Sequence, residues 1–225
     1  MNDYEIAKSL EAETVSHRRF FHENAEVGLE MPKAVKYVFE QLEAAGLQPR
    51  KCGHGVTAQL GSGGKTLLLR ADMDALPIQE ANSVDYCSQT PGVMHACGHD
   101  ANVTCLLGAA KVLARRRDRF GGEVRLVFQP AEEIGQGAKA FVDAGVLDGA
   151  TRVFGLHAAP ELPSGSVGLK PGVNNAAVDH FWITVQGKST HVCSPSWGST
   201  LCTLQARSSW PSRRWSPAAP RPLSR

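Results

Sequence analysis

The stretch Met94-His95-Ala96-Cys97-Gly98-His99-Asp100 holds the pattern on which the fold prediction rests, a thiol and an imidazole separated by one glycine. In an extended segment, residues i and i+2 point to the same side, so Cys97 and His99 can face one metal ion. Gly98 lets the backbone pass close to whatever they hold. From these residues alone, a chance Cys-x-His with a small buried cysteine remains the alternative.

Two later stretches favour the metal interpretation. The apolar run in residues 127–133 (VFQPAEE) ends in the adjacent acids Glu132 and Glu133, and residues 153–157 (VFGLH) end in His157. Consecutive residues at a strand end point in different directions, so one acid can bind a metal while its neighbour reaches the reacting water. A solvated acidic turn is the alternative. Apolar runs that end in potential ligands predict a site at one edge of a sheet.

The order of five motifs carries a family resemblance. RADMDALPI (residues 70–78), MHACGHD, QPAEE, GLH and GKSTH (residues 187–191) follow one another along the chain. In this order they resemble the metal-dependent amidohydrolases of the zinc-peptidase type, which include hippurate hydrolase, indoleacetyl-amino-acid hydrolases and bacterial aminoacylases. The resemblance covers the chain from Arg18 to about Gly198.

The resemblance implies a two-metal enzyme. Its substrate would be an N-acyl amino acid or a short peptide, and its cofactors two divalent ions (Zn, Mn, Co or Ni). Glu132 would be the general base, and His191 of a lid domain would reach the active site of the partner subunit, so a homodimer is expected. An ordinary surface histidine is the alternative for His191. The implied metal ligands in this sequence are Cys97, His99, Glu133 and His157.

A buried-type strand, Leu67 to Asp74, emerges into two acids. In the wider family of two-metal peptidases, the equivalent strand end carries a ligand and a nearby Asp, whereas here it has the sequence D-M-D. Asp74, and secondarily Asp72, would therefore orient ligands by hydrogen bonding. The alternative is a pair of solvated acids before the Ala-Leu-Pro turn.

Composition excludes several classes of protein. At 225 residues, 42% hydrophobic and 20% charged, the chain has a globular composition. An acidic, polar N-terminus and the lack of a long apolar stretch predict neither a secretion signal nor a membrane span. Six scattered cysteines favour a reducing cytoplasm. The basic cluster at residues 115–117 ends an expected helix, where the helix dipole favours cations, so no nucleic-acid binding is predicted.

Alternating helical and strand-like segments predict an α/β fold, a mixed sheet flanked by helices. A helix is expected from Tyr4 to about His22, and His22 is given no ligand role because a histidine packed at a helix end is commoner. Further helices are expected from Pro32 until Gly46 stops the helix, after His99 over the periodic run 103–114 that ends in the basic cluster 115–117, and over residues 138–144. The expected strands are residues 56–60, 66–69, 123–128 and 152–156.

Three regions are predicted. Residues 1–167 would form the N-terminal, incomplete part of the catalytic domain. Residues 168–198 would begin a smaller α+β lid and dimerisation domain, with a half-exposed strand at residues 176–185. Residues 199–225 form a low-complexity tail with five arginines, four prolines and no acid.

The tail departs from the family, which continues with a helix of the form Gly-Val-Asp-Ala-Leu. A one-base shift would restore roughly that pattern, so the hypothesis is a truncated, frameshifted chain. The family's last histidine ligand follows the lid, and all eight histidines here lie at or before His191. A catalytically inactive fragment is therefore the alternative to an active enzyme. An unaltered tail in independent reads of the gene would contradict the frameshift.

Overall fold

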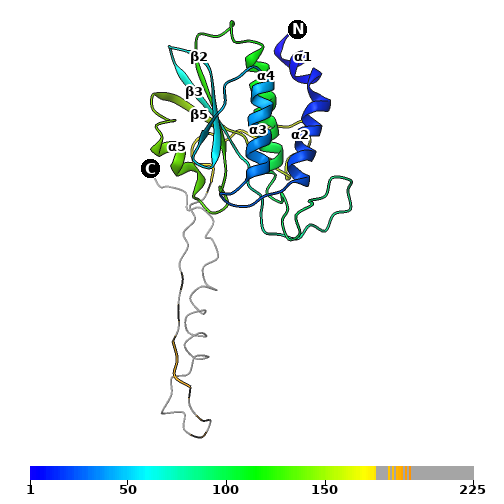
Figure 1. Cartoon of the computed structure of the whole chain (residues 1–225), viewed down its shortest axis with the longest axis vertical. Coiled ribbons are helices and arrows are strands. Elements are labelled where there is room, and N and C mark those ends of the chain that lie inside the picture. Colours follow the sequence, from blue (N-terminus) through cyan, green and yellow to red (C-terminus); the bar gives the residue numbers. More distant parts are fainter. Residues whose placement is uncertain (176–181, 183, 185, 190, 192, 194–225) are drawn as a thin grey trace, which may run out of the picture. The chain divides into compact units, whose positions relative to one another are not determined.

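The computed structural model describes residues 1–175, 182, 184, 186–189, 191 and 193. The chain divides into two compact units, Met1–Ser166 and Val167–Arg225. In the first unit, helices α1 to α4 cover one face of a sheet and α5 covers the other (Figure 1). This arrangement confirms the predicted mixed α/β sheet flanked by helices. Most of the strand expected at residues 176–185, and the whole low-complexity tail, lie outside the described residues.

The sheet has five strands in the order β1-β2-β4-β3-β5. Strand β4 is antiparallel to β2, and β1 is antiparallel to β2, whereas β3 is parallel to both β4 and β5. The three parallel strands therefore have their carboxyl ends at one edge of the sheet. The strand bounds are β1 Arg50–Cys52, β2 Gly55–Ser62, β3 Thr66–Asp72, β4 Gly122–Gln129 and β5 Ala150–Gly155.

The helices follow the expected segments with one correction. A single helix from Tyr4 to His22 was expected, but the chain turns at the buried Leu10, whose N–H bonds to Ala7 in a tighter turn before the next helix begins. Helix α3 begins with Pro32, which suits the first helical position because its missing N–H would be unpaired there. The bounds are α1 Asp3–Ser9, α2 Glu11–Glu23, α3 Pro32–Ala44, α4 His99–Ala114 and α5 Gly137–Asp143.

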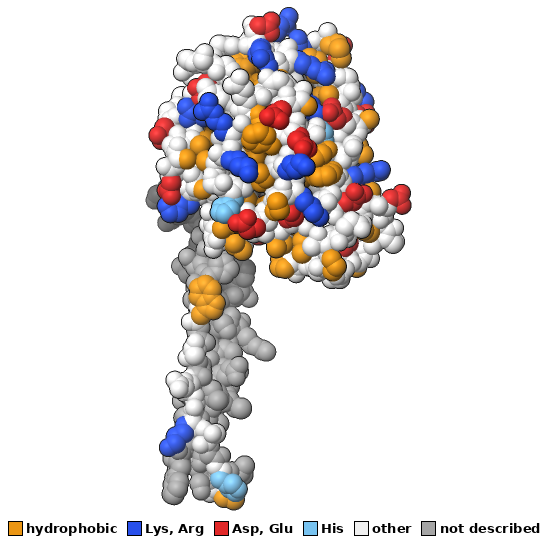
Figure 2. Space-filling model, in the orientation of Figure 1, with side chains coloured by type: hydrophobic (Ala, Val, Ile, Leu, Met, Phe, Trp, Pro, Cys, Tyr) orange, Lys and Arg blue, Asp and Glu red, His pale blue; other side chains and the backbone are white. Residues whose placement is uncertain are grey.

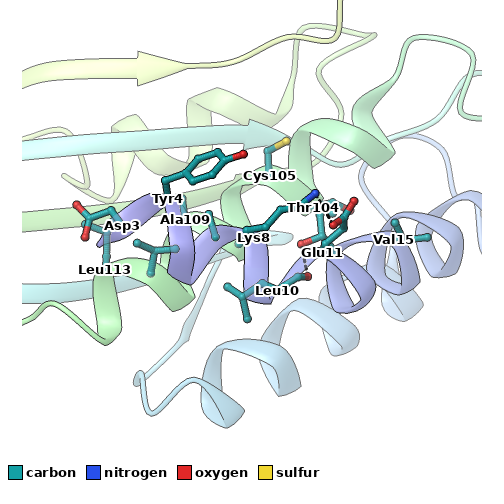
Figure 3. Close-up of a pocket in the computed structure, with 14 residues that line it drawn as sticks. Asp3, Tyr4, Lys8, Leu10, Glu11, Val15, Thr104, Cys105, Ala109 and Leu113 are labelled. Carbon is teal, nitrogen blue, oxygen red and sulfur yellow. Dashed lines mark hydrogen bonds and ion pairs between the residues drawn. The ribbon is translucent and has the colours of Figure 1, made fainter. Parts of the chain in front are cut away.

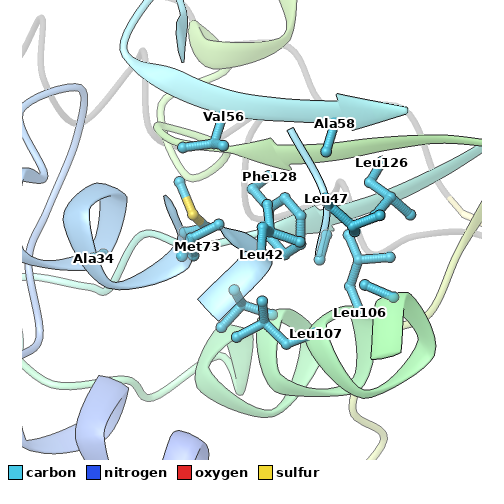
Figure 4. Close-up of a cluster of buried hydrophobic side chains, with 14 of the residues drawn as sticks. Ala34, Leu42, Leu47, Val56, Ala58, Met73, Leu106, Leu107, Leu126 and Phe128 are labelled. Carbon is cyan, nitrogen blue, oxygen red and sulfur yellow. The ribbon is translucent and has the colours of Figure 1, made fainter. Parts of the chain in front are cut away.

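Strand β4 contributes side chains to the hydrophobic clusters on both faces of the sheet, because alternate residues of a strand point to opposite faces. Val124, Leu126 and Phe128 face the helices, and Val127 faces α5, where it packs with Phe141. Figure 4 shows Leu42, Leu106 and Leu107 of α3 and α4 directed toward Val56, Ala58, Leu126 and Phe128 of the sheet. Because Phe128 is fully buried, its truncation to Ala would cost about 3–5 kcal/mol.

Strand β5 differs from the other strands because its apolar side chains are exposed. Val153 and Phe154 point to opposite faces, yet each retains more than half of its accessible surface, 58% and 56%. The strand pairs with β3 only. Within the described residues, β5 is thus an uncovered edge of the sheet.

The surface of the first unit mixes charges of both signs. On the face shown in Figure 2, Lys and Arg side chains lie among Asp and Glu side chains rather than gathering into one basic area. Between α1, α2 and α4 there is a hollow of about 790 Å³ lined by residues such as Tyr4, Leu10, Cys105 and Ala109 (Figure 3). No helix in the described part of the chain is both long and apolar enough to cross a membrane.

Candidate metal centre

His99 is the first residue of α4 and is fully buried. Gly98 precedes it in the left-handed conformation, with φ 86°, and a Cβ at this glycine would lie 2.8 Å from the Ala158 side chain. The expectation of an extended segment at Cys97 and His99 is therefore wrong: a left-handed turn at the helix start directs the two side chains. Nδ1 of His99 lies 2.8 Å from the Asp74 carbonyl oxygen and donates to it, so Nε2 is the ring nitrogen left to face a cation.

Five side chains meet around Nε2 of His99, and together we call them the ligand cluster. The sulfur of Cys97 lies 3.5 Å from Nε2 of His157. From Nε2 of His99, the distances to the nearest carboxylate oxygens of Glu133 and Glu132 are 3.8 and 3.9 Å. The structure thus brings together the residues that the sequence predicts at this edge of the sheet, namely Cys97, His99, Glu132, Glu133 and His157.

Glu132 and Glu133 are presented by a strained turn after β4. Ala131 has φ 52°, the one left-handed residue other than glycine in the described chain. Gly137 packs against this turn, where an added Cβ would lie 1.6 Å from the Pro130 carbonyl oxygen. These constraints fix the direction of both carboxylates.

Asp74 holds this turn in place. Its two carboxylate oxygens accept hydrogen bonds from the backbone N–H groups of Glu132 and Glu133, at 3.0 and 3.1 Å, and one of them lies 3.5 Å from Nδ1 of His99. Burial would raise the pKa of Asp74, but the hydrogen bonds from His99, Glu133 and Glu132 outweigh it and lower the pKa. The side chain is thus ionised and placed to orient three members of the ligand cluster.

Asp72 connects the sheet to the segment that carries His157. Its carboxylate accepts hydrogen bonds from Arg70 at 2.8 Å and from the Asn102 amide at 2.7 Å, and Asn102 in turn accepts from the Ala158 N–H. Asp72 also lies 3.7 Å from Nε2 of His99. Asn102 was not predicted from the sequence, although its place three residues after His99 puts it on the same side of the helix start.

The donor set fits a divalent metal. Among the described residues, the buried side-chain atoms without a hydrogen-bond partner are Nδ1 of His95, Nε2 of His99 and Oε1 of Glu133, and the last two face each other. Ligand atoms about 2.0–2.3 Å from one zinc ion lie about 3.3–3.8 Å apart, which matches the separations in the ligand cluster. Thiolate, imidazole and carboxylate together suit borderline metals.

The surroundings of Cys97 disfavour the thiolate form of its side chain. Burial raises the pKa of its thiol, and a hydrogen bond to Glu133 and the charges of Glu133, Glu132 and Asp72 raise it further, to about 12. A metal ion would reverse this balance and favour the thiolate.

Two further histidines, His191 and His22, have other hydrogen-bond partners. His191 belongs to the second unit, where it is exposed and its Nδ1 accepts from the Cys193 N–H at 3.3 Å. His22 is buried at the end of α2, and its ring bonds to Asp100 and Glu80. The role implied for His191 therefore stays a prediction.

A mixed α/β unit with thiol, imidazole and carboxylate side chains beyond the carboxyl ends of parallel strands has the arrangement expected of a metallopeptidase domain. The comparison with known families agrees: residues 68–218 match the Peptidase family M20/M25/M40, and the chain belongs to this family. The match reaches past Gly198, where the sequence analysis places the end of the resemblance. The predicted family is thereby confirmed.

Over the stretch that aligns, two relatives are identical to this chain at about two fifths of the positions. It is 41% identical to N-acetyl-L-cysteine deacetylase of Bacillus subtilis, over 83% of this chain and 46% of that protein. It is 39% identical to N-acyl-L-amino acid amidohydrolase of Geobacillus stearothermophilus, over 84% of this chain and 53% of that protein. The chain thus spans about half the length of these relatives.

Two solved structures share the fold. The YXEP protein of Bacillus subtilis, described as a dinuclear metal binding peptidase of the M20 family, superposes with a TM-score of 0.70 at 38% identity, covering 72% of this chain and 47% of that chain. An aminobenzoyl-glutamate utilization protein of Klebsiella pneumoniae has a TM-score of 0.58 at 27% identity, covering 74% and 48%. The first unit therefore has the fold of an M20 peptidase.

Proposed function

We propose that this protein contributes the metal centre of an amidohydrolase that cleaves the amide bond of N-acyl amino acids. The observation that carries the proposal is the ligand cluster, in which buried, unpartnered atoms of His99 and Glu133 face each other beside Cys97 and His157. Names of the relatives, which include deacetylases and amidohydrolases of N-acyl amino acids, support this substrate class.

Four residues would hold two divalent ions, namely Cys97, His99, Glu133 and His157. The donor chemistry favours Zn, Mn, Co or Ni. A divalent ion held there would act as a Lewis acid and lower the pKa of a water ligand from about 15.7 toward about 7. Asp74 would keep Glu132, Glu133 and His99 in register through its hydrogen bonds.

Glu132 is proposed as the general base. Its side chain is 41% exposed, whereas that of Glu133 is 21% exposed, so Glu132 is the acid that reaches solvent. Glu132 would take a proton from the attacking water as the new carbon–oxygen bond forms, and would return it to the amine as the carbon–nitrogen bond breaks. His191 would stabilise the carbonyl oxygen across a homodimer, as the resemblance implies.

Two alternatives remain within the proposal. Thermostable carboxypeptidase 2 of Saccharolobus solfataricus is 43% identical to this chain over 84% of it and 50% of that protein, so a peptide is the alternative substrate. The other alternative is a chain that binds metal without turnover. We keep the proposed regions 1–167, 168–198 and 199–225, and a cytoplasmic location, as parts of the same proposal.

Metal content tests the proposal first. Elemental analysis of the desalted 225-residue protein should give about two ions per chain, and assays would then compare N-acyl amino acids with dipeptides. Metal with hydrolysis of N-acyl amino acids supports the proposal, preference for dipeptides favours the peptidase, and metal without turnover favours the non-catalytic alternative. Absence of bound metal after loading with zinc, manganese, cobalt and nickel would refute the metal centre.

Substitution of the general base is the first mutational test. In a form of the protein that hydrolyses N-acyl amino acids, Glu132→Gln should keep its metal content and lose at least ~100-fold in kcat, the usual scale for a general base. Glu43→Gln, an exposed acid on α3, is the matched control and should keep both. Near-normal turnover of Glu132→Gln would remove Glu132 from this role.

A further inference from the structure

A second buried polar cluster lies behind the start of α4. It consists of Arg18, His22, Glu80 and Asp100, and we call it the clasp cluster. The His22 side chain is 4% exposed and lies between two carboxylates: Nδ1 is 2.7 Å from Asp100 and Nε2 is 3.0 Å from Glu80. Arg18 completes the cluster at 2.8 Å from the same oxygen of Asp100. Side chains from α2, from α4 and from the loop of residues 77–93 thus meet at the imidazole ring of His22.

His22 carries a positive charge in this cluster. Carboxylate oxygens only accept hydrogen bonds, so both ring nitrogens must donate. The hydrogen bond to Asp100 raises the pKa of His22, and that to Glu80 adds to it, against the opposing effect of burial. Two cations then balance two carboxylates, beside the rings of Tyr86 and His95. Unlike the ligand cluster, the clasp cluster balances its charges among its own members.

One end of the clasp fixes the first turn of α4. Asp100 directly follows His99, and one carboxylate oxygen is bonded to His22 and Arg18 while the other accepts from the Ala101 N–H at 2.9 Å. Its carbonyl oxygen accepts from the Thr104 hydroxyl at 2.7 Å. The helix turn that presents His99 to the ligand cluster is therefore tied to α2 through His22.

The other end fixes the loop of residues 77–93. Besides His22, the Glu80 carboxylate accepts from the Ser88 N–H at 2.6 Å and the Asn82 amide at 3.1 Å, so the loop folds around it. Leu76 and Met94 close the loop by two backbone hydrogen bonds of 3.0 Å, three residues before Cys97. The guanidinium groups of Arg18 and Arg19 lie 5.1 and 4.9 Å from the Tyr86 ring centroid. Through Glu80, the approach to Cys97 is also tied to α2.

We propose that His22 is a positioning residue of the metal centre: its ring fastens the 77–93 loop and the first turn of α4 to α2, and so holds Cys97 and His99 at a fixed separation. This inference rests on the proposed metal function. His22 contacts no member of the ligand cluster, so it acts through Asp100 and Glu80.

Cobalt binding tests the positioning role. Co²⁺ bound through a thiolate and imidazoles absorbs visible light, and its spectrum reports the geometry of the ligands. A general loss of stability would not alter this spectrum as long as the protein is folded. Wild type, His22→Gln and the control His17→Gln would be titrated with Co²⁺ under conditions where all are folded by circular dichroism. His17 is likewise buried on α2, but it bonds to Tyr37 and Lys111 instead of the loop.

We expect His22→Gln to bind Co²⁺ at least ~10-fold more weakly with an altered spectrum, since both N–H donors of glutamine lie on one nitrogen and cannot replace two ring nitrogens that face different carboxylates. His17→Gln should match wild type. Unchanged affinity and spectrum in His22→Gln would overturn the positioning role alone. Failure of wild type to bind Co²⁺ would instead refute the metal function on which it rests. If His22→Gln does not fold, Glu80→Gln takes its place in the test. In this variant, hydrogen exchange of the backbone amides in residues 77–93 should be faster than in wild type, and Co²⁺ should bind more weakly. Unchanged hydrogen exchange would overturn the proposal.

Discussion

The ligand cluster and the clasp cluster lie on adjacent residues of one helix turn, yet they differ in how their polar atoms are satisfied. His99 leads into a group with an excess of carboxylates and two buried atoms that no described residue bonds. Asp100 leads into a group whose two carboxylates are matched by Arg18 and His22. A folded protein seldom leaves buried polar atoms unpaired without a use for them. The comparison indicates that the first group is built for a ligand and the second for rigidity.

The largest expected difference between the clusters is in stability. Asp100→Ala should lower the free energy of unfolding of the metal-free protein by about 3–5 kcal/mol, because it removes one of the two carboxylates that pair with the buried His22 and the carboxylate that pairs with the partly exposed Arg18. His99→Gln should cost less, about 1 kcal/mol, because only the hydrogen bond from Nδ1 to the Asp74 carbonyl oxygen is at stake and Nε2 has no partner to lose. Urea denaturation of both variants after treatment with a chelator measures these energies.

Equal losses in the two variants would contradict the comparison. They would mean that the ligand cluster contributes as much to folding as the clasp cluster does. The matched control is Asp143→Asn, an exposed acid on α5 paired with Lys139, whose loss should cost less than ~0.5 kcal/mol.

The next effect concerns metal affinity. Asp74→Asn should weaken metal binding about 10–100-fold, because an amide cannot accept from both the Glu132 and Glu133 N–H groups while facing His99. Competition with a chromophoric chelator measures the affinity, and Asp143→Asn again serves as the control. An Asp74→Asn protein with wild-type affinity would show that the turn after β4 holds its shape without this carboxylate.

Sequence reasoning predicted the residues of the ligand cluster because their positions follow from local rules. Glu132, Glu133 and His157 each come after an apolar run, and parallel strands bring such ends to one edge of a sheet. The order of the five sequence motifs along the chain predicted the family. The conformation at Cys97 was predicted wrongly because only the position of Gly98 against Ala158 reveals the left-handed turn.

The clasp cluster was not predictable in the same way. His22 and Asp100 are separated by 78 positions, and His22 and Glu80 by 58. No local period links a helix end, a loop and a helix start, so His22 could only be interpreted as a packed histidine. Its partners follow from the packing of α2 against α4, which the sequence does not encode as a pattern. The break at Leu10 escaped prediction for a similar reason, since the residue has no helix-breaking side chain.

The smallest expected effect depends on pH and concerns Glu80. Burial would raise the pKa of Glu80, but hydrogen bonds from the Ser88 N–H and from His22 lower it from 4.5 to about 2. The unfolded chain therefore takes up this proton first, so the stabilisation is complete above the unfolded pKa and is lost as the pH falls toward 2. Glu80→Gln has no such proton to bind. Its deficit in unfolding free energy should be ~1–2 kcal/mol at pH 7 and smaller near pH 3.5.

Urea denaturation at the two pH values decides whether the Glu80 carboxylate has this part in the clasp cluster. Glu43→Gln should differ from wild type by less than ~0.5 kcal/mol at both, because that side chain is exposed on α3. A deficit in Glu80→Gln that stays constant with pH would mean that lost packing, not lost charge, destabilises the variant. The satisfied charges of the clasp cluster would then no longer distinguish it from the ligand cluster, and the contrast would rest on the unpaired atoms of His99 and Glu133 alone.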